Sequence, residues 1–459
     1  MSTALAASFL SSTIEGGSLV RSRNNTDEAD DDFHEQLPPE SAGHYRGQSS
    51  VCFIGTVCST MMGSTLMSLP WAFENAGLAA SLVMICLVAA VSYYTCFLIL
   101  YWGASPDGKF NDFSDLCCHY LGTWSRHVAN GTSVAVCIGV CTIYHVLIAS
   151  SLQAVVLSIG DLTNSDVNFF CCGSGNFEYT VSSVAVAICV FPLTCFRTID
   201  RLMKLGTYGG ISVLYNAGFI VFNALVYWPD ANLQSDNRVK IAGNMKDFGV
   251  FFGTLGLSLF IHSLLLQMGS AHCCSASKPS VVKRDVAISY VLAVIFYVAV
   301  GAVPAVAFQL GGQQYPNAKG GMLPQNILLA YNHSSWGAII GRTALVLQIF
   351  IVYPLLATVI RGQFYSSLMG TAWPGWKLSI SFTLGLVMFT TLISSVYPKP
   401  GSVVGYVGVY TAIIYMLALP FSVHLKARKA ANRATLRSTV GHCIIFVIVC
   451  FAFLMQFIF

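Results

Sequence analysis

Long apolar stretches alternate with short polar ones along most of the chain, and each stretch approaches the roughly 20 residues that a membrane-spanning helix needs. These stretches cover residues 51–74, 79–102, 129–158, 180–196, 205–228, 248–269, 286–308, 336–360, 378–396, 402–424 and 440–459. Residues 1–50 precede them and are polar and acidic. The pattern predicts an all-α polytopic membrane protein with eleven transmembrane helices (residues 51–459) behind a disordered acidic tail (residues 1–50).

The distribution of basic residues predicts the orientation of these helices. With an odd number of spans, most lysines and arginines of the predicted loops lie on the same side as the N-terminus, which places that side in the cytosol. Residues 113–128 are too polar to span and are predicted to lie along the cytosolic surface. The sequon at Asn332 falls in an outward loop, where glycosylation could occur.

Composition excludes several classes of function. The chain is 55% hydrophobic and only 10% charged, whereas a soluble globular protein carries roughly 25% charged residues. The net charge of +4 is small, so a nucleic-acid partner is not indicated. No Cys/His run has zinc spacing and no nucleophile–base pair is apparent, so we expect neither a metal centre, nor a cofactor, nor an enzyme.

The first apolar stretch is interrupted at its centre by poor helix formers. Glycine leaves the backbone unscreened and neighbouring hydroxyls offer alternative hydrogen bonds, so a helix opens readily there. Within a membrane, bared N–H and C=O groups persist only where they line a cavity in the protein. Two half-helix ends of opposite partial charge would then suit a zwitterion such as an amino acid. The predicted substrate-binding residues are Thr60, Met61, Met62, Gly63, Ser64 and Thr65.

A second interruption is expected in the sixth stretch. Secondary transporters often repeat a block of helices with inverted topology and bind substrate between broken helices of the two halves. The corresponding divisions are residues 51–228 for the first repeat, 248–424 for the second and 440–459 for an extra helix. The sixth stretch carries Gly253, Gly256 and Ser258 at its middle. Gly256 and Ser258 therefore join the candidate binding residues, although glycine also permits close helix packing.

Two histidines, His145 and His262, lie deep inside predicted spans. An ionisable group inside a membrane is a functional candidate by default, here as a proton relay or gate. The alternative is a neutral imidazole bonded to a neighbouring helix. Both interpretations stay open for His145, whereas the position of His262 one turn past the predicted break favours function. No carboxylate is expected inside the membrane as a proton carrier.

Several motifs resemble the amino acid/auxin permease family, a branch of the amino acid, polyamine and organocation transporters. The motifs are residues 60–64 followed by Leu69-Pro70-Trp71, residues 196–215, Phe260-Ile261-His262, Arg284-Asp285 with Tyr290 and Tyr297, and residues 348–356. The resemblance runs from about residue 44 to the C-terminus. It implies a LeuT-like fold with a five-plus-five inverted repeat and an amino acid bound at the unwound first helix. It also implies amino acid efflux from lysosomes or endosomes, and signalling through the cytosolic tail to Rag GTPases and Ragulator.

Two residues depart from the family pattern at positions associated with sodium. Ser59 stands where the family has an asparagine, and Ile351 stands where it has a threonine. Sodium is a hard cation that needs oxygen ligands, and isoleucine supplies none. The sequence therefore favours coupling to protons, or to no ion, over sodium, and Ser59 and Ile351 are candidate coupling residues.

Two functions stay open at this point. The first is secondary active transport of an amino acid across a lysosomal or late endosomal membrane, with the plasma membrane or a vacuole as alternatives. The second is a receptor of the same fold that binds an amino acid, recruits Rag-type partners through residues 1–50 and transports little. The sequence does not identify the amino acid, because the predicted site consists largely of backbone.

Overall fold

The computed structural model describes residues 48–103, 110, 112–163, 176–195, 209–228, 239–270, 272, 279–311, 315–318, 321–371, 373–432 and 436–458. The predicted acidic tail, up to residue 47, lies outside this part of the chain, as does the start of the motif at residues 196–215.

The part of the chain that the structure describes is helical throughout and contains no strand. The helices of the first half are α2 (Ser50–Met61), η1 (Ser64–Ser68), α3 (Leu69–Ala76), α4 (Leu78–Gly103), α5 (Phe113–Leu121), α6 (Thr123–Thr163), α7 (Asn176–Cys195) and α9 (Gly209–Val226). Those of the second half are α10 (Met245–Ser258), α11 (Leu265–Ser270), α12 (Pro279–Gln309), η3 (Ile327–Leu329), α13 (Trp336–Met369), α14 (Trp376–Val396), α15 (Pro400–Thr411), η4 (Ala412–Ala418), α16 (Leu419–Ala430) and α17 (Leu436–Ile458).

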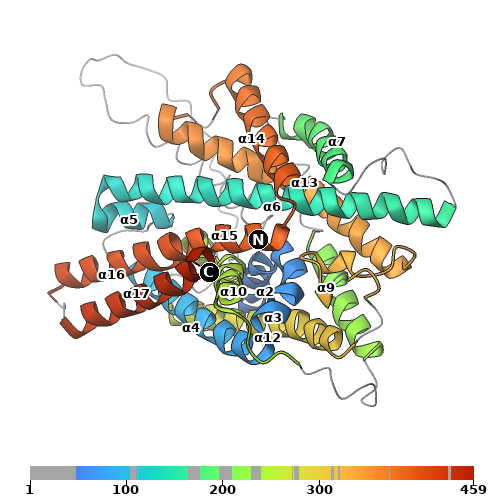
Figure 1. Cartoon of the computed structure of the whole chain (residues 1–459). Helices are drawn as coiled ribbons and strands as arrows, with labels where there is room; N and C mark the ends of the chain where they lie inside the picture. The colour runs from blue at the N-terminus through green and yellow to red at the C-terminus, as the bar shows by residue number, and fades with distance from the viewer. Residues whose placement is uncertain are drawn as a thin grey trace.

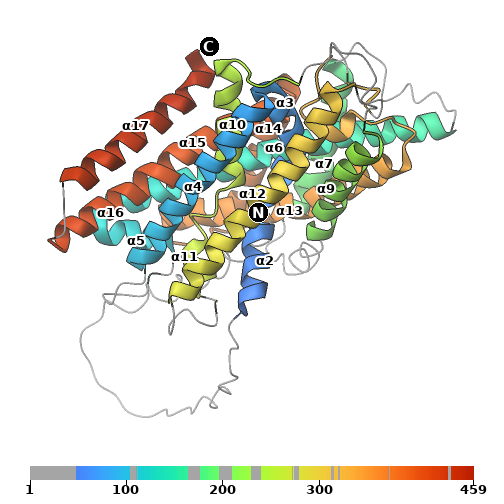
Figure 2. The same cartoon turned by 90° about the horizontal axis from the view of Figure 1, so that it is seen from below.

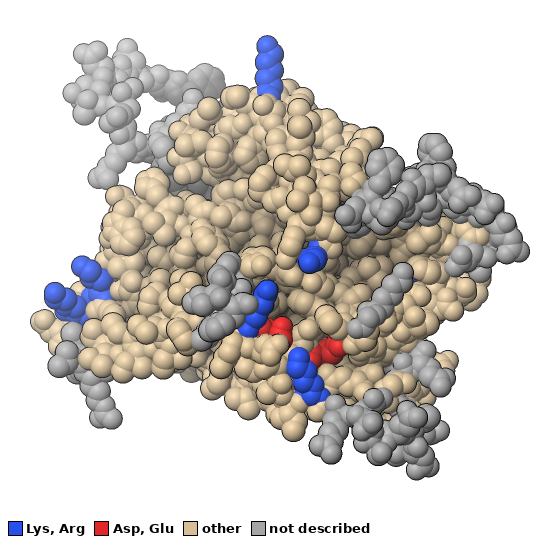
Figure 3. Space-filling model, viewed as in Figure 1, with Lys and Arg blue, Asp and Glu red and all other residues tan. Residues whose placement is uncertain are grey.

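Seven helices within the described residues are long and apolar enough to cross a membrane, or eight if the bent pair α2 and α3 counts as one span. The seven are α4, α6, α9, α12, α13, α14 and the continuous run from α15 to α16. Each predicted apolar stretch coincides with a helix or a pair of helices, but α10 and the described apolar parts of α7 and α17 are shorter than a span. Eleven spans and the inverted repeat therefore stay predictions. Charged side chains are sparse on the face in Figure 3, as expected of a surface that meets lipid.

The helices pack in layers around α6, which crosses the middle of Figure 1. On one side, α6 contacts α7, α13 and α14, and these also contact one another. On the other side, α6 contacts α15, which packs against α10. α10 in turn contacts α3 and α4, and both of these contact α12. α2 packs against α12, and α9 lies between α12 and α13. The two interrupted spans, α2–α3 and α10–α11, therefore both belong to the second group, with α10 at its centre.

The polar segment at residues 113–128 divides between two helices. Only α5 is a separate short helix, capped by the Asp112 carboxylate, which accepts a hydrogen bond of 2.8 Å from the Asp115 N–H. Gly122 has φ +95°, so the chain turns there and α6 already begins at Thr123. As a result α6 is 41 residues long and starts before the predicted third span.

Candidate functional site

The first span is broken where the sequence predicts it. α2 ends at Met61, Met62 leaves the helical region with ψ 87°, and Gly63 is extended with φ −112° and ψ −166°. The chain re-enters a helix through the 3₁₀ turn η1, and α3 continues after a bend of 54° between the two halves. The predicted opening of the helix around Gly63 is confirmed.

The break in the sixth span lies a few residues later than predicted. α10 continues through Gly253 and Gly256 to Ser258, and residues 259–264 form turns before α11. A Cβ atom at Gly253 would lie 2.1 Å from the Gly405 carbonyl oxygen of α15. One at Gly256 would lie 3.0 Å from the Cβ of Ala412. These glycines therefore allow α10 and α15 to pack closely instead of breaking the helix, and the location predicted for the break is wrong by a few residues.

Tyr297 on α12 connects the two breaks. Its hydroxyl lies 2.7 Å from the carbonyl oxygen of Met61, at the end of α2, and 2.9 Å from that of Ser258, at the end of α10. One hydroxyl proton serves only one of these carbonyls at a time. Tyr290, two turns earlier on α12, donates to the Leu259 carbonyl in the second break at 3.1 Å. The carbonyl ends of two half-helices, each carrying partial negative charge, are thus held together at the centre of the protein.

Partial positive charge lies on the other side of the first break, opposite the partial negative charge of these carbonyl ends. The first N–H groups of a helix have no acceptor within it, so η1 presents partial positive charge next to Gly63. Thr65, in η1, has a buried hydroxyl with no hydrogen-bond partner among the described residues. Thr60, by contrast, uses its hydroxyl within α2, where it donates to the Thr56 carbonyl at 2.8 Å. The open donors and acceptors of the site are therefore mostly backbone groups, together with the Thr65 hydroxyl.

One face of α2 is polar and exposed. Gly55 and Ser59 are exposed and Thr56 is half-buried, whereas Phe53 and Val57 on the opposite face are buried. α2 packs principally against α12, and Figure 2 shows it at the edge of the bundle with the N-terminal end pointing outward. A face of small and hydroxyl residues has no affinity for lipid tails and suits a water-filled vestibule. This face runs along α2 from its start toward the break, where Thr60, Met61 and Thr65 are buried.

The other end of the first span is closed. The Glu74 carboxylate of α3 accepts a hydrogen bond of 2.8 Å from the Leu323 N–H, in the loop before α13. The Gly243 N–H donates to the Ala76 carbonyl at 2.8 Å, and Lys240 donates to the Asn75 carbonyl. The loop before α10 and the loop before α13 therefore cover the C-terminal end of α3.

Two carboxylates near the ends of predicted spans are buried in the protein. Glu74 is 7% exposed in α3, and Asp285 is fully buried in α12. Asp285 pairs with His272 at 3.0 Å and with Arg284 at 2.9 Å. Hydropathy alone did not mark either residue as buried. The partner of Glu74 is 249 positions away, whereas Asp285 pairs with its neighbour Arg284 and with His272, 13 positions away.

The candidate histidines occupy different positions. His145 on α6 bonds Ser183 of α7 through Nε2, with 3.0 Å to the carbonyl, and its Nδ1 lies 3.4 Å from the Thr390 hydroxyl of α14. That network joins three helices away from the breaks, which favours the structural interpretation for His145. His262 lies inside the second break, where its Nε2 is 2.8 Å from the Thr95 hydroxyl of α4. Its Nδ1 is buried without a partner among the described residues, so the functional interpretation stays open.

The two candidate coupling residues lie on α2 and α13. Ser59 donates to the Thr56 carbonyl at 3.0 Å on the exposed face of α2. Ile351 is half-buried on α13 and provides no oxygen. Within the described residues no group of three or more His, Cys, Asp or Glu side chains is arranged to hold a metal ion.

Sequence reasoning missed the buried arginine of α13. Arg342 is fully buried and donates to the carbonyls of Leu328 and Tyr331 at 2.9 and 2.8 Å, and to the Ser158 hydroxyl at 3.1 Å. It fixes the loop that carries η3 over the closed end of the protein. Arg342 lies within the predicted stretch 336–360, but its partners there are backbone carbonyls and a serine of α6, which hydropathy does not indicate.

The motifs, the two broken helices and the sequence as a whole agree with one family. The family model described as transmembrane amino acid transporter protein matches residues 47–459. The chain belongs to this transmembrane amino acid transporter family. The resemblance to amino acid/auxin permeases, proposed from the motifs, is therefore confirmed, and the family consists of transporters rather than enzymes.

Curated relatives of this family member are neutral amino acid transporters. It is 27% identical over 471 residues to the sodium-coupled neutral amino acid transporter 9 homolog of Caenorhabditis elegans, an alignment covering 90% of this chain and 74% of that protein. It is 23% identical over 441 residues to the neutral amino acid transporter 9 of Danio rerio, covering 86% of this chain and 78% of that one.

Two solved structures share the fold at low sequence identity. MhsT, in complex with L-phenylalanine, has a TM-score of 0.52 at 12% identity, covering 88% of this chain and 97% of that one. Mhp1, in an inward-facing conformation, has a TM-score of 0.57 at 11% identity, covering 94% of this chain and 93% of that one. These similarities support the fold of this transmembrane amino acid transporter family member, and the fold alone.

Proposed function

We propose that this protein moves an amino acid across the membrane by alternating access and holds it at the break in the first span. The observation that carries the proposal is that Tyr297 pairs the carbonyl ends of two half-helices at Met61 and Ser258. Four residues after Met61 lies the buried Thr65 hydroxyl, which has no hydrogen-bond partner among the described residues. The substrate ammonium would lie at the carbonyls of Met61 and Ser258, and its carboxylate at the N–H groups of η1. Each end of the zwitterion then meets the opposite partial charge.

The shape of the molecule supports access from one side at a time. The exposed polar face of α2 leads from the side where the chain begins to the break, while loops cover the far end of α3. With the N-terminus in the cytosol, as the basic loops favour, this conformation is open toward the cytosol. Movement of α2 toward the bundle would close that side, and release of the loops at Glu74 would open the other.

The proposal also covers the class of amino acid transported, the coupling ion and the membrane in which the protein resides. The printed names of the relatives favour a neutral amino acid, and the resemblance favours a lysosomal or late endosomal membrane. We propose that sodium does not drive transport, because Ile351 replaces an oxygen ligand, and that coupling is to protons or absent. A signalling role of residues 1–50 with Rag-type partners is the accompanying hypothesis, and pull-down with that segment tests it.

Uptake of labelled amino acids into proteoliposomes tests transport directly. We expect saturable uptake that is abolished by Gly63→Trp, because the indole would fill the break. Gly385→Trp on α14 is the matched control, since Gly385 is exposed and a Cβ there meets nothing within 4 Å; it should keep its uptake. Binding of an amino acid to the wild type without any flux would contradict the transporter and support the receptor.

A further inference from the structure

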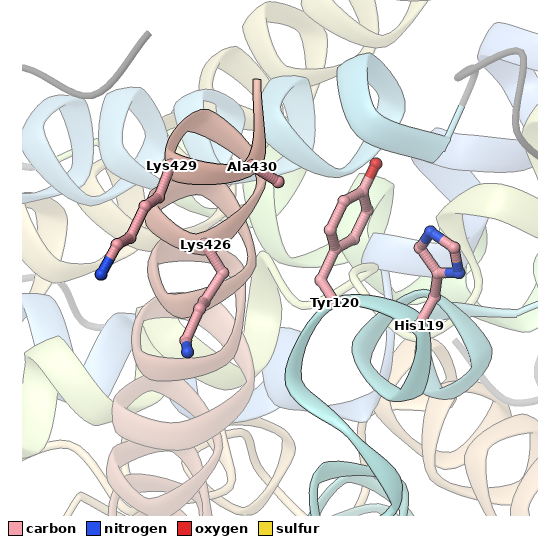
Figure 4. Close-up of a pocket in the computed structure, with 5 residues that line it drawn as sticks. All are labelled: His119, Tyr120, Lys426, Lys429 and Ala430. Carbon is pink, nitrogen blue, oxygen red and sulfur yellow. The ribbon is translucent and has the colours of Figure 1, made fainter. Parts of the chain in front are cut away.

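A cleft separate from the proposed transport site lies between the C-terminal ends of α5 and α16. It measures about 420 Å³ and is lined by His119, Tyr120, Lys426, Lys429 and Ala430. In Figure 4 the two lysines and Ala430 come from the last turns of α16, and Tyr120 and His119 come from the end of α5. Small-molecule sites commonly measure about 300–1,000 Å³, so this cleft has room for a small polar headgroup.

Aromatic residues around the cleft indicate its depth in the membrane. Tyr120 packs edge-on against Trp102 at the end of α4, with ring centroids 5.9 Å apart. The Trp102 indole N–H donates to His424 Nδ1 at 3.0 Å, and Tyr101 packs against Trp102 at 5.0 Å. Tryptophan and tyrosine concentrate at the membrane–water interface, where their polar atoms reach the headgroups. The cleft therefore opens at the level of lipid headgroups.

The charges of the cleft favour an anion. Lys426 and Lys429 are exposed, and neither makes an ion pair within the described part of the chain. The carbonyl ends of α5 and α16 each contribute about half a negative charge, so two lysines exceed what the helix ends neutralise.

The acidic side chains of Asp112 and Asp115 lie at the N-terminal end of α5, and the cleft lies at its C-terminal end. Asp112 accepts hydrogen bonds from the Ser114 hydroxyl and the Asp115 N–H, both at 2.8 Å. Asp115 pairs with Arg126 at 2.9 Å. Neither carboxylate lines the cleft, so the lysines keep their charge available for a ligand.

We propose that this cleft binds the phosphorylated headgroup of an anionic membrane lipid. Lysine ammonium groups are compact charges on flexible stems and suit a phosphate monoester. In Figure 4 they point away from Tyr120 and His119, so they would have to turn toward the cleft for the Tyr120 hydroxyl and the His119 imidazole to donate further hydrogen bonds to the same phosphate. Basic pockets between transmembrane helices on one face of the membrane bind such headgroups by the same chemistry. The site goes beyond the proposed transport function and does not depend on it.

The surroundings favour a lipid over a soluble phosphate. α17 packs beside α16 through His442 and His424, whose ring centroids are 5.0 Å apart. The following turns of α17 expose Ile444 and Val447, at 53% and 64%. Acyl chains could lie along such an apolar face while the phosphate occupies the cleft.

The test is a binding titration on the purified full chain in detergent. Short-chain phosphatidylinositol monophosphate, short-chain phosphatidylcholine and the water-soluble inositol headgroup are compared. We expect the phosphorylated lipid to bind most tightly. The double variant Lys426→Gln/Lys429→Gln should weaken its binding by about 25-fold, since each lysine near a membrane surface contributes about fivefold.

Two controls separate a defined site from general charge. Lys377→Gln/Lys399→Gln removes the same charge from two other exposed lysines and should leave affinity within about twofold of the wild type. Lys426→Arg/Lys429→Arg keeps the charge and should retain binding. Equal losses in the two glutamine variants, or no preference over phosphatidylcholine, would overturn the proposal. Equally tight binding of the soluble headgroup would overturn its assignment to a membrane lipid.

Discussion

Removing the Tyr297 hydroxyl should weaken substrate binding through the geometry of the broken helices. Tyr297 is fully buried, and its hydroxyl is 2.7 and 2.9 Å from the Met61 and Ser258 carbonyls. The Tyr297→Phe variant lacks the hydroxyl that holds the C-terminal ends of α2 and α10 close together. A buried hydrogen bond contributes about 0.5–1.5 kcal/mol net. That corresponds to about a 2- to 12-fold loss of affinity.

Tyr353→Phe is the matched control for this experiment. Tyr353 is equally buried, and its hydroxyl lies 2.8 Å from the Thr390 hydroxyl, on helices outside the breaks. Both variants lose one buried hydroxyl, so both should lose similar thermal stability. Only Tyr297→Phe should raise the dissociation constant or the KM for the transported amino acid, measured by equilibrium binding and by proteoliposome uptake. Equal effects of the two variants on affinity, or no effect of either, would refute the role assigned to the broken ends.

Three further predictions concern other parts of the molecule. Thr65→Val should lower substrate affinity by about 2- to 12-fold in a binding assay without lowering the melting temperature, because its hydroxyl has no partner to lose among the described residues; a drop in stability alone would contradict this. Replacing sodium by choline should leave uptake unchanged, since Ile351 supplies no oxygen, and a large loss of uptake would show a sodium site. Gly253→Ala should destabilise the protein by about 1–3 kcal/mol, because its Cβ would lie 2.1 Å from the Gly405 carbonyl; Gly385→Ala, which meets open space, should melt like the wild type.

The break at Gly63 was predictable because local chemistry alone specifies it. A glycine between hydroxyl residues at the centre of an apolar stretch lowers the cost of leaving the helix, and no distant contact is needed to see this. The glycines of α10 carry the same local signal with a different outcome. Gly253 and Gly256 face α15, a helix about 150 residues later in the chain, and only that contact shows that they serve packing.

The parts of the site that sequence reasoning did not assign depend on long-range contacts. Tyr297 and Met61 are 236 positions apart, and Glu74 and Leu323 are 249 apart. Periodicity and hydropathy report neighbours within a few turns of a helix and contain no information on such pairs. The motifs marked Tyr290 and Tyr297 as features of a family without giving them a role. Their hydrogen bonds to the broken helices suggest why the pattern includes tyrosines there.

The most direct test of the account is a structure of the protein bound to the amino acid it transports. We predict that the amino group lies within hydrogen-bond distance of the Met61 and Ser258 carbonyls, and the carboxylate at the N–H groups of η1 beside Gly63. Density for the amino acid elsewhere, with residues 60–65 making no contact to it, would contradict the claim that the broken first helix binds the substrate.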